Sequence, residues 1–121
     1  MLVVANIVVI VVVLVQIWAL ALEMFLWNKP TGLRTFGQSL EQAQSSAVLA
    51  ANQGLYNGLF AACLIFGLLY PEPTAALHFK TFVLACIVVA GAYGGITVGF
   101  RLFLFQGVPA IVAIILLWLA R

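Results

Sequence analysis

The sequence predicts an all-α integral membrane protein, folded as a four-helix bundle with antiparallel, up-and-down connectivity. Of its 121 residues, 66% are hydrophobic and only 7% are charged, and the mean hydropathy is +1.25. Soluble domains average about 45–50% apolar and about 25% charged residues. One span needs about 20 apolar residues, so four spans with short loops use the whole length, and residues 1–121 are predicted to form a single transmembrane domain. This composition excludes a soluble globular domain, a disordered tail and a nucleic-acid-binding protein.

The first predicted helix covers about residues 2–27, a long apolar run rich in valine and isoleucine. These residues favour strands in water. In lipid, however, an isolated span must satisfy its backbone hydrogen bonds internally, so the run has to be helical. The turn-forming sequence Asn28-Lys29-Pro30-Thr31-Gly32 ends the helix, and a loop is expected to continue to about Gln38.

The second predicted helix covers about residues 40–69. Ser39 and Gln42 have the spacing of a capping box, which places its start near Leu40. The sequence Tyr70-Pro71-Glu72-Pro73 ends it, because prolines cannot continue a helix.

The third predicted helix covers about residues 75–100, with Thr74 as its cap. Lys80, near its start, is expected to extend its side chain back to the membrane interface.

The fourth predicted helix covers about residues 102–120, and its start has two interpretations. Arg101 marks a membrane edge, and Gln106-Gly107-Val108-Pro109 is a second break with proline suited to a first turn. The helix either begins at Leu102 and kinks, or begins near Val108 and is unusually short.

Polar side chains within the apolar runs are the most informative feature of the sequence. Such groups are costly in hydrocarbon and usually face a bundle interior or a cavity. Because the helices alternate in direction, these residues all fall in the half of the membrane nearest the loops after the first and third helices. Glu23, the only acid inside an apolar run, is a functional candidate by default. The predicted pocket residues are Glu23, Trp27, Asn52, Gln53, Tyr56, Asn57, Tyr93, Thr97 and Gln106.

Glycines at four-residue spacing accompany these polar residues and predict close helix packing. They are Gly54 and Gly58 on the second helix, and Gly91, Gly95 and Gly99 on the third. The same faces suggest association of two copies of the chain. The sequence contains no catalytic triad, phosphate-binding loop or metal-ligand cluster, so no catalytic residue, metal or cofactor is predicted.

The distribution of Lys and Arg predicts the orientation of the chain in the membrane. The loops after the first and third helices hold Lys29, Arg34 and Arg101, whereas the opposite side holds Lys80 and Arg121. Since positive loops tend to be cytoplasmic, the first pair of loops is predicted to be inside.

Five segments form an ordered series along the chain. They are Glu23-Met24-Phe25-Leu26-Trp27, Phe36-Gly37, Leu49-Ala50-Ala51-Asn52-Gln53-Gly54-Leu55-Tyr56-Asn57-Gly58, Ala90-Gly91-Ala92-Tyr93-Gly94 and Gln106-Gly107-Val108-Pro109-Ala110. Together they resemble the small bacterial membrane proteins called domain of unknown function 1304. The resemblance implies a four-helix protein of the bacterial inner membrane and supplies no reaction. Family members often carry a histidine seven residues before the glutamate, and this chain has Gln16 there.

Three classes of function fit these observations. The favoured hypothesis is binding or transport of a small polar or amphipathic molecule, a lipid or a proton, with Glu23 as charge or proton acceptor. The second is a structural or regulatory membrane subunit in which the polar cluster only fixes helix packing. The third, and least favoured, is a membrane enzyme with Glu23 as general base, because the sequence offers no nucleophile or metal site. The lipid bilayer is the predicted surrounding in every case.

Overall fold

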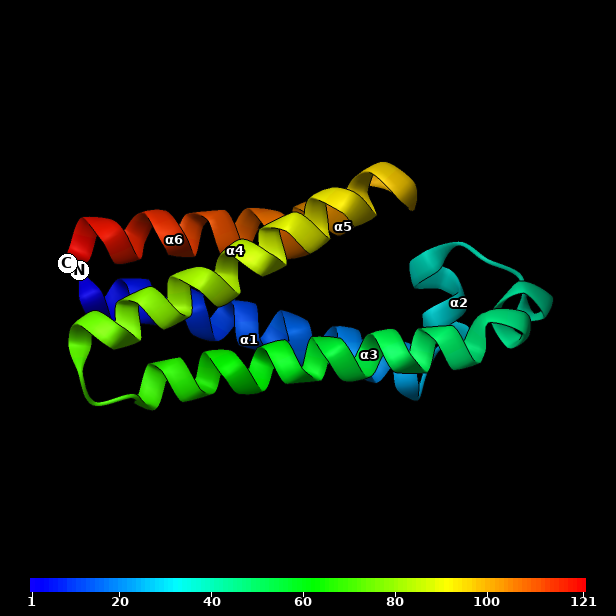
Figure 1. Ribbon diagram of the computed structural model, residues 1–121. Helices are drawn as coiled ribbons and strands as arrows, with labels where there is room; N and C mark the ends of the chain where they lie inside the picture. The colour runs from blue at the N-terminus through cyan, green and yellow to red at the C-terminus, as the bar shows by residue number, and fades with distance from the viewer. The chain divides into compact units, whose positions relative to one another are not determined.

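The protein is built from helices, as shown by a computed structural model that describes residues 1–121 (Figure 1). Four helical stretches are long and apolar enough to cross a membrane. This confirms the predicted all-α membrane fold. In chain order the elements are α1 (Leu2–Met24), α2 (Pro30–Phe36), α3 (Leu40–Leu69), α4 (Pro73–Thr97), α5 (Phe100–Leu102), the π-helix η1 (Phe103–Gly107) and α6 (Val108–Ala120).

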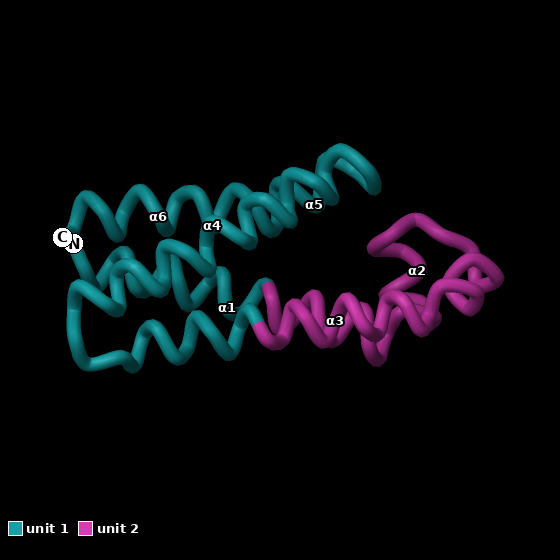
Figure 2. Tube along the Cα trace, viewed as in Figure 1, with its two compact units in different colours: residues 1–15, 60–121 teal, residues 16–59 magenta.

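The helices group into two compact units (Figure 2). Unit 1 consists of residues 1–15 and 60–121, and unit 2 consists of residues 16–59. Both units contain part of α1 and part of α3. The single transmembrane domain over residues 1–121 stays a prediction.

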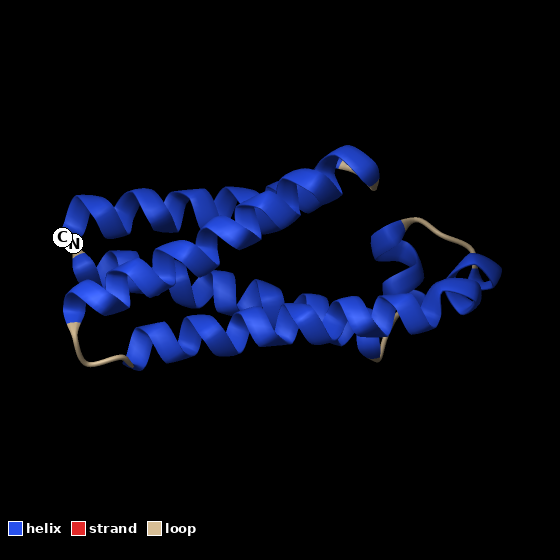
Figure 3. Cartoon of the chain, in the orientation of Figure 1, coloured by secondary structure: helices blue, strands red, loops and turns tan.

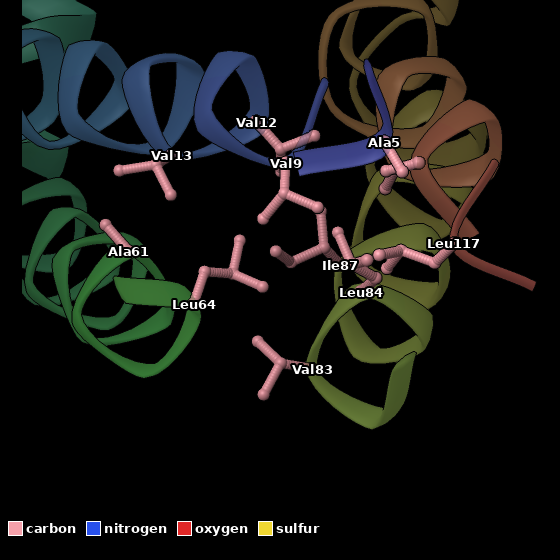
Figure 4. Close-up of a cluster of buried hydrophobic side chains, with 12 residues drawn as sticks. Ala5, Val9, Val12, Val13, Ala61, Leu64, Val83, Leu84, Ile87 and Leu117 are labelled. Carbon is pink, nitrogen blue, oxygen red and sulfur yellow. The ribbon is translucent and has the colours of Figure 1, made fainter. Parts of the chain in front are cut away.

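Unit 1 is an antiparallel bundle of four helical segments, taken from α1, α3, α4 and α6. The short loop Tyr70–Glu72 reverses the chain between α3 and α4 (Figure 3). Side chains from all four segments point towards one another and form one apolar core (Figure 4). The buried members are Ala5, Val9, Val12, Val13, Ala61, Leu64, Val83, Leu84, Ile87, Ala110, Ala113 and Leu117.

Unit 2 pairs the end of α1 with the first part of α3, and its α3 begins as predicted. The Ser39 hydroxyl accepts a hydrogen bond from the Gln42 backbone N–H at 3.1 Å, and the Gln42 side-chain oxygen accepts one from the Ser39 N–H at 3.0 Å. These reciprocal bonds confirm the capping box and satisfy donors that a helix start leaves free.

The segment between the first two spans differs from the prediction, because it contains the short helix α2. Pro30 occupies the first turn, where its missing N–H costs nothing. Gly37 ends the helix with φ +62° and its N–H bonded to the Leu33 carbonyl; only glycine adopts this conformation easily. Residues that indicated a loop therefore begin and end a helix. The helix α1 ends at Met24 rather than near Trp27, since the chain turns into α2.

The start of α4 also differs from the prediction. The helix begins at Pro73, and its cap is Glu72 rather than Thr74. The Glu72 carboxylate accepts hydrogen bonds from the backbone N–H groups of Ala75 at 2.6 Å and Thr74 at 3.1 Å. A carboxylate at a helix start is favoured because it meets both free donors and the positive end of the helix dipole.

The last span runs from Phe100 to Ala120 and follows the first of the two interpretations, with a start two residues earlier. Its interruption is the π-helix η1, which directly precedes the Pro109 turn. Proline lacks an N–H and its ring clashes with the carbonyl of the residue four positions before it. A π-helical turn relieves this clash while the helix continues.

Candidate functional site

A hydrogen bond between two polar side chains lies at the centre of unit 2. The side-chain amide of Asn57, on α3, donates to the carboxylate of Glu23, which is half-buried near the end of α1. Asn57 is only 7% exposed. The only acid inside an apolar run is therefore held by a buried neutral donor.

Glycines allow the backbones of α1 and α3 to approach closely at this point. A Cβ atom on Gly54 would lie 2.7 Å from the Met24 side chain, 3.1 Å from Glu23 Cβ and 3.2 Å from the Leu20 carbonyl oxygen. A Cβ on Gly58 would meet the tip of Leu20 at 2.4 Å. Because α3 has no side chain at these positions, the short Asn57 side chain reaches the carboxylate on α1.

The other polar residues predicted on α3 do not join this pair. The buried line of α3 passes through Ala50, Gly54 and Asn57, at the spacing of three and four residues that defines one helix face. Asn52, Gln53 and Tyr56 are exposed, and the Asn52 amide donates to the Val48 carbonyl of its own helix at 2.9 Å.

Trp27 is close to Glu23 in the sequence, but its side chain contacts other residues. Its indole N–H donates to the Ser46 hydroxyl at 3.1 Å. Its ring packs against Phe36 of α2, with 4.7 Å between the ring centroids. Trp27 therefore joins α2 to α3 within unit 2.

The remaining predicted residues belong to unit 1. Tyr93 is exposed, and its backbone carbonyl accepts a hydrogen bond from the Thr97 hydroxyl at 2.8 Å. Gln106 is half-buried within η1. Their part in a common site with Glu23 stays a prediction.

The predicted packing glycines of α4 face the last span. A Cβ on Gly91 would lie 2.8 Å from the Gly107 backbone nitrogen, and one on Gly95 would lie 2.8 Å from the Phe103 side chain. Gly99 has open space around it. The faces around Gly91 and Gly95 thus pack within the chain, and association of two copies through glycine faces stays a prediction.

Gln16 is a buried polar residue that the sequence-based pocket did not include. It is 1% exposed, and neither its amide nitrogen nor its amide oxygen has a hydrogen-bond partner. It precedes Glu23 by seven residues, two turns along the same face of α1 and about 10 Å away along the axis. Buried amides without partners are rare because each unmet hydrogen bond costs free energy. In the sequence, the seven-residue spacing between Gln16 and Glu23 indicates that both lie on the same face of the first helix.

The pair and Gln16 define what this site offers chemically. A carboxylate has about four lone-pair positions for hydrogen bonds, and Asn57 is a single donor to Glu23. The site therefore suits a positively charged or hydrogen-bond-donating group. No group of three or more His, Cys, Asp or Glu side chains is placed to hold a metal ion.

Comparisons with known proteins name a family. Residues 10–118 match the family described as "Protein of unknown function (DUF1304)". The chain is also 34% identical, over 96 residues, to a protein of Lactococcus lactis subsp. lactis named "Uncharacterized protein YpaA". The match covers 78% of this chain and 79% of that protein. No solved structure matches the chain. The family match covers nearly the whole sequence, so this membrane protein belongs to the DUF1304 family of unknown function.

Proposed function

We propose that this protein is a membrane-embedded binding protein for a small amphipathic molecule whose polar head carries positive charge or N–H or O–H donors. The observation that carries the proposal is the hydrogen bond from buried Asn57 to Glu23. An acid within a membrane span is a functional candidate because it is costly to keep there.

The hydrogen bond from Asn57 does not fully offset the free-energy cost of placing an ionised Glu23 in the membrane. An ionised residue in the middle of a membrane helix costs about 2.5–3.5 kcal/mol on insertion scales, and less near its end. One hydrogen bond to a charged group returns about 1.5–3 kcal/mol. Asn57 thus offsets much of the cost that Glu23 carries when it is ionised, but supplies no counter-charge. A ligand that brings positive charge or further donors would stabilise the carboxylate more.

The residues between Glu23 and Gln16 favour an amphipathic ligand over a purely polar one. Ala19 and Leu20 are the intervening residues nearest this face of α1, and both are apolar. Leu20 packs on Gly58 of α3, so a ligand with its head at Glu23 would place its aliphatic part along Ala19. The proposal also includes transport of such a molecule and binding of a proton.

We further propose that the protein resides in the bacterial inner membrane with residues 25–39 and 98–99 on the cytoplasmic side. Lys29 and Arg34, both exposed, support this orientation, because short basic loops remain in the cytoplasm. To test this orientation, Lys29 or Glu72 is replaced by a single cysteine, which is then labelled in intact cells with a membrane-impermeant maleimide. Labelling at position 72 alone is expected, and labelling at position 29 alone would contradict the orientation.

A structural or regulatory subunit is the second candidate, favoured by the close packing at Gly54. In that case the Glu23–Asn57 bond only fixes α1 against α3. The two candidates differ in one observable, since a structural pair holds no ligand.

Native mass spectrometry of the purified protein, combined with extraction of small molecules, tests the proposal. Wild type is compared with Glu23→Gln and with Glu41→Gln, which removes an exposed acid from the same unit. We expect an amine-bearing or hydroxyl-bearing amphiphile that co-purifies with wild type and Glu41→Gln and is lost from Glu23→Gln. The same species on all three proteins, or none on any, would contradict the proposal.

A further inference from the structure

A buried lysine in unit 1 forms a second polar site. Lys80, on α4, is 5% exposed, and its ammonium donates a hydrogen bond to the Asn6 side-chain oxygen on α1 at 3.0 Å. The Lys80 side chain lies inside the bundle of unit 1, and its expected extension back to the membrane interface stays a prediction. The side chain lies there because of Gly67 on α3, where an added Cβ would lie 2.6 Å from Lys80 Cγ. The glycine leaves a slot for the lysine stem, which directs the ammonium to Asn6.

The hydrogen-bond partner of the Lys80 ammonium is an uncharged amide. An ammonium has three N–H donors, and the Asn6 oxygen accepts one of them without balancing the charge. Glu72, the acid nearest to Lys80 in the sequence, uses its carboxylate to cap α4. A buried charge without a counter-charge costs free energy, and an anionic group placed beside it would recover that cost.

The position of Lys80 within unit 1 indicates which anion is available. Lys80 lies in the second turn of α4 and Asn6 in the second turn of α1, so both are within about 10 Å of a helix start. The next residue, Thr81, accepts a hydrogen bond from the Trp118 indole N–H at 2.9 Å. Tryptophans at helix ends mark the level of lipid headgroups, and this places the ammonium close to lipid phosphates.

Arg121 and His78 lie around the same tryptophan, and Arg121 is the charged one of the two. The Arg121 guanidinium lies 4.7 Å from the centre of the Trp118 ring. The His78 ring stacks on Trp118 with 6.0 Å between centroids. Both residues are exposed. The end of unit 1 that holds Lys80 therefore presents positive charge to the headgroup region as well as within the bundle.

We propose that the Asn6–Lys80 pair binds the phosphate group of an anionic phospholipid, with the lysine ammonium as its principal donor. Phosphate oxygens accept the remaining N–H groups and supply the missing negative charge. The lipid tail then lies along the apolar surface of the spans. This site does not depend on the proposed function of Glu23.

Native mass spectrometry of the full chain in detergent, titrated with phosphatidylglycerol or phosphatidylcholine, tests this site. Lys80→Met keeps the stem and removes the charge, Lys80→Arg keeps the charge, and Lys29→Met removes an exposed lysine as a matched control. We expect wild type, Lys80→Arg and Lys29→Met to prefer phosphatidylglycerol. Lys80→Met is expected to bind it about tenfold more weakly while its binding of phosphatidylcholine is unchanged.

Further arms of the experiment identify the source of the phosphate and guard against misfolding. Excess inorganic phosphate is expected to leave phosphatidylglycerol bound, which assigns the site to the lipid; displacement by inorganic phosphate would overturn the lipid assignment. If Lys80→Met does not fold, Lys80→Gln, which also removes the charge but can still donate to Asn6, provides the comparison, and the same weakening is expected. Equal retention of phosphatidylglycerol by wild type and the folded charge-removing variant would overturn the proposal.

Discussion

The amide of Asn57 donates a hydrogen bond to the carboxylate of Glu23, and thereby joins α3 to α1 across 34 residues of sequence. Gly54, three residues before Asn57 on the same face, makes this approach feasible. The acid therefore has a fixed position while most of its hydrogen-bonding capacity is free. This combination suits a binding site, because a polar ligand meets an acceptor that is already held in place.

The first prediction concerns the strength of this pair. Glu23→Gln, Asn57→Leu and the double variant form a double-mutant cycle, measured as free energies of unfolding in detergent. A coupling energy of about 1 kcal/mol is expected, within the range of side-chain hydrogen bonds in membrane proteins. The control cycle uses Glu41→Gln with Asn57→Leu and should be additive within about 0.5 kcal/mol. Additivity in both cycles would show that the pair contributes nothing to the fold.

The second prediction concerns the close approach at Gly54. Gly54→Ala places a methyl group against the Met24 side chain and the Leu20 carbonyl oxygen. The two helices then have to separate, which should cost about 1–3 kcal/mol of unfolding free energy. Gly99→Ala, in open space, is the matched control and should change stability by less than about 0.5 kcal/mol. Thermal unfolding followed by circular dichroism measures both variants, and equal melting temperatures would contradict the packing at Gly54.

The third prediction concerns the start of α3. Ser39→Ala removes the hydroxyl that accepts from the Gln42 N–H. Loss of such a cap costs about 1 kcal/mol. The same unfolding experiment measures it, and Ser45→Ala serves as a control because that hydroxyl bonds only to the Gln42 carbonyl within its own helix. A larger loss in the control than in Ser39→Ala would argue against the capping box.

The fourth prediction concerns pH. The backbone N–H groups of Ala75 and Thr74 hold the pKa of the Glu72 carboxyl below its usual value. A carboxyl with a lower pKa in the folded state contributes stability above the pKa of the unfolded chain, about 4.3. That contribution is lost as the pH falls through the folded pKa. Wild type should therefore be more stable than Glu72→Gln near pH 7, and the difference should shrink below about pH 4. A difference that grows on acidification would refute the cap.

Much of the fold could be predicted from the sequence because its signals are local. Apolar runs longer than a bilayer is thick have to be helices, and the Ser39–Gln42 spacing correctly placed the start of α3. The helix α2 could not be predicted in this way. Seven residues are too few to show a helical period, and Pro30 and Gly37 indicate a loop as well as they begin and end a helix.

The candidate site could be predicted in composition but not in its pairing. Four polar residues of α3 are predicted to lie at about the same membrane depth as Glu23: Asn52, Gln53, Tyr56 and Asn57. Their positions around the helix do not by themselves show which of them bonds to Glu23. The register between α1 and α3 decides, and it is set by how Gly54 packs on α1. The inward direction of the Lys80 side chain could not be predicted either, because it depends on the space at Gly67, a residue of another helix.

The most direct test of the central claim is infrared difference spectroscopy of the protein before and after addition of hexylamine, a simple amphiphile with a cationic head. We predict a saturable change in the carboxylate stretching bands in wild type and in Glu41→Gln, and its loss in Glu23→Gln. Identical difference spectra for wild type and Glu23→Gln would show that this acid binds no such head group and would contradict the account.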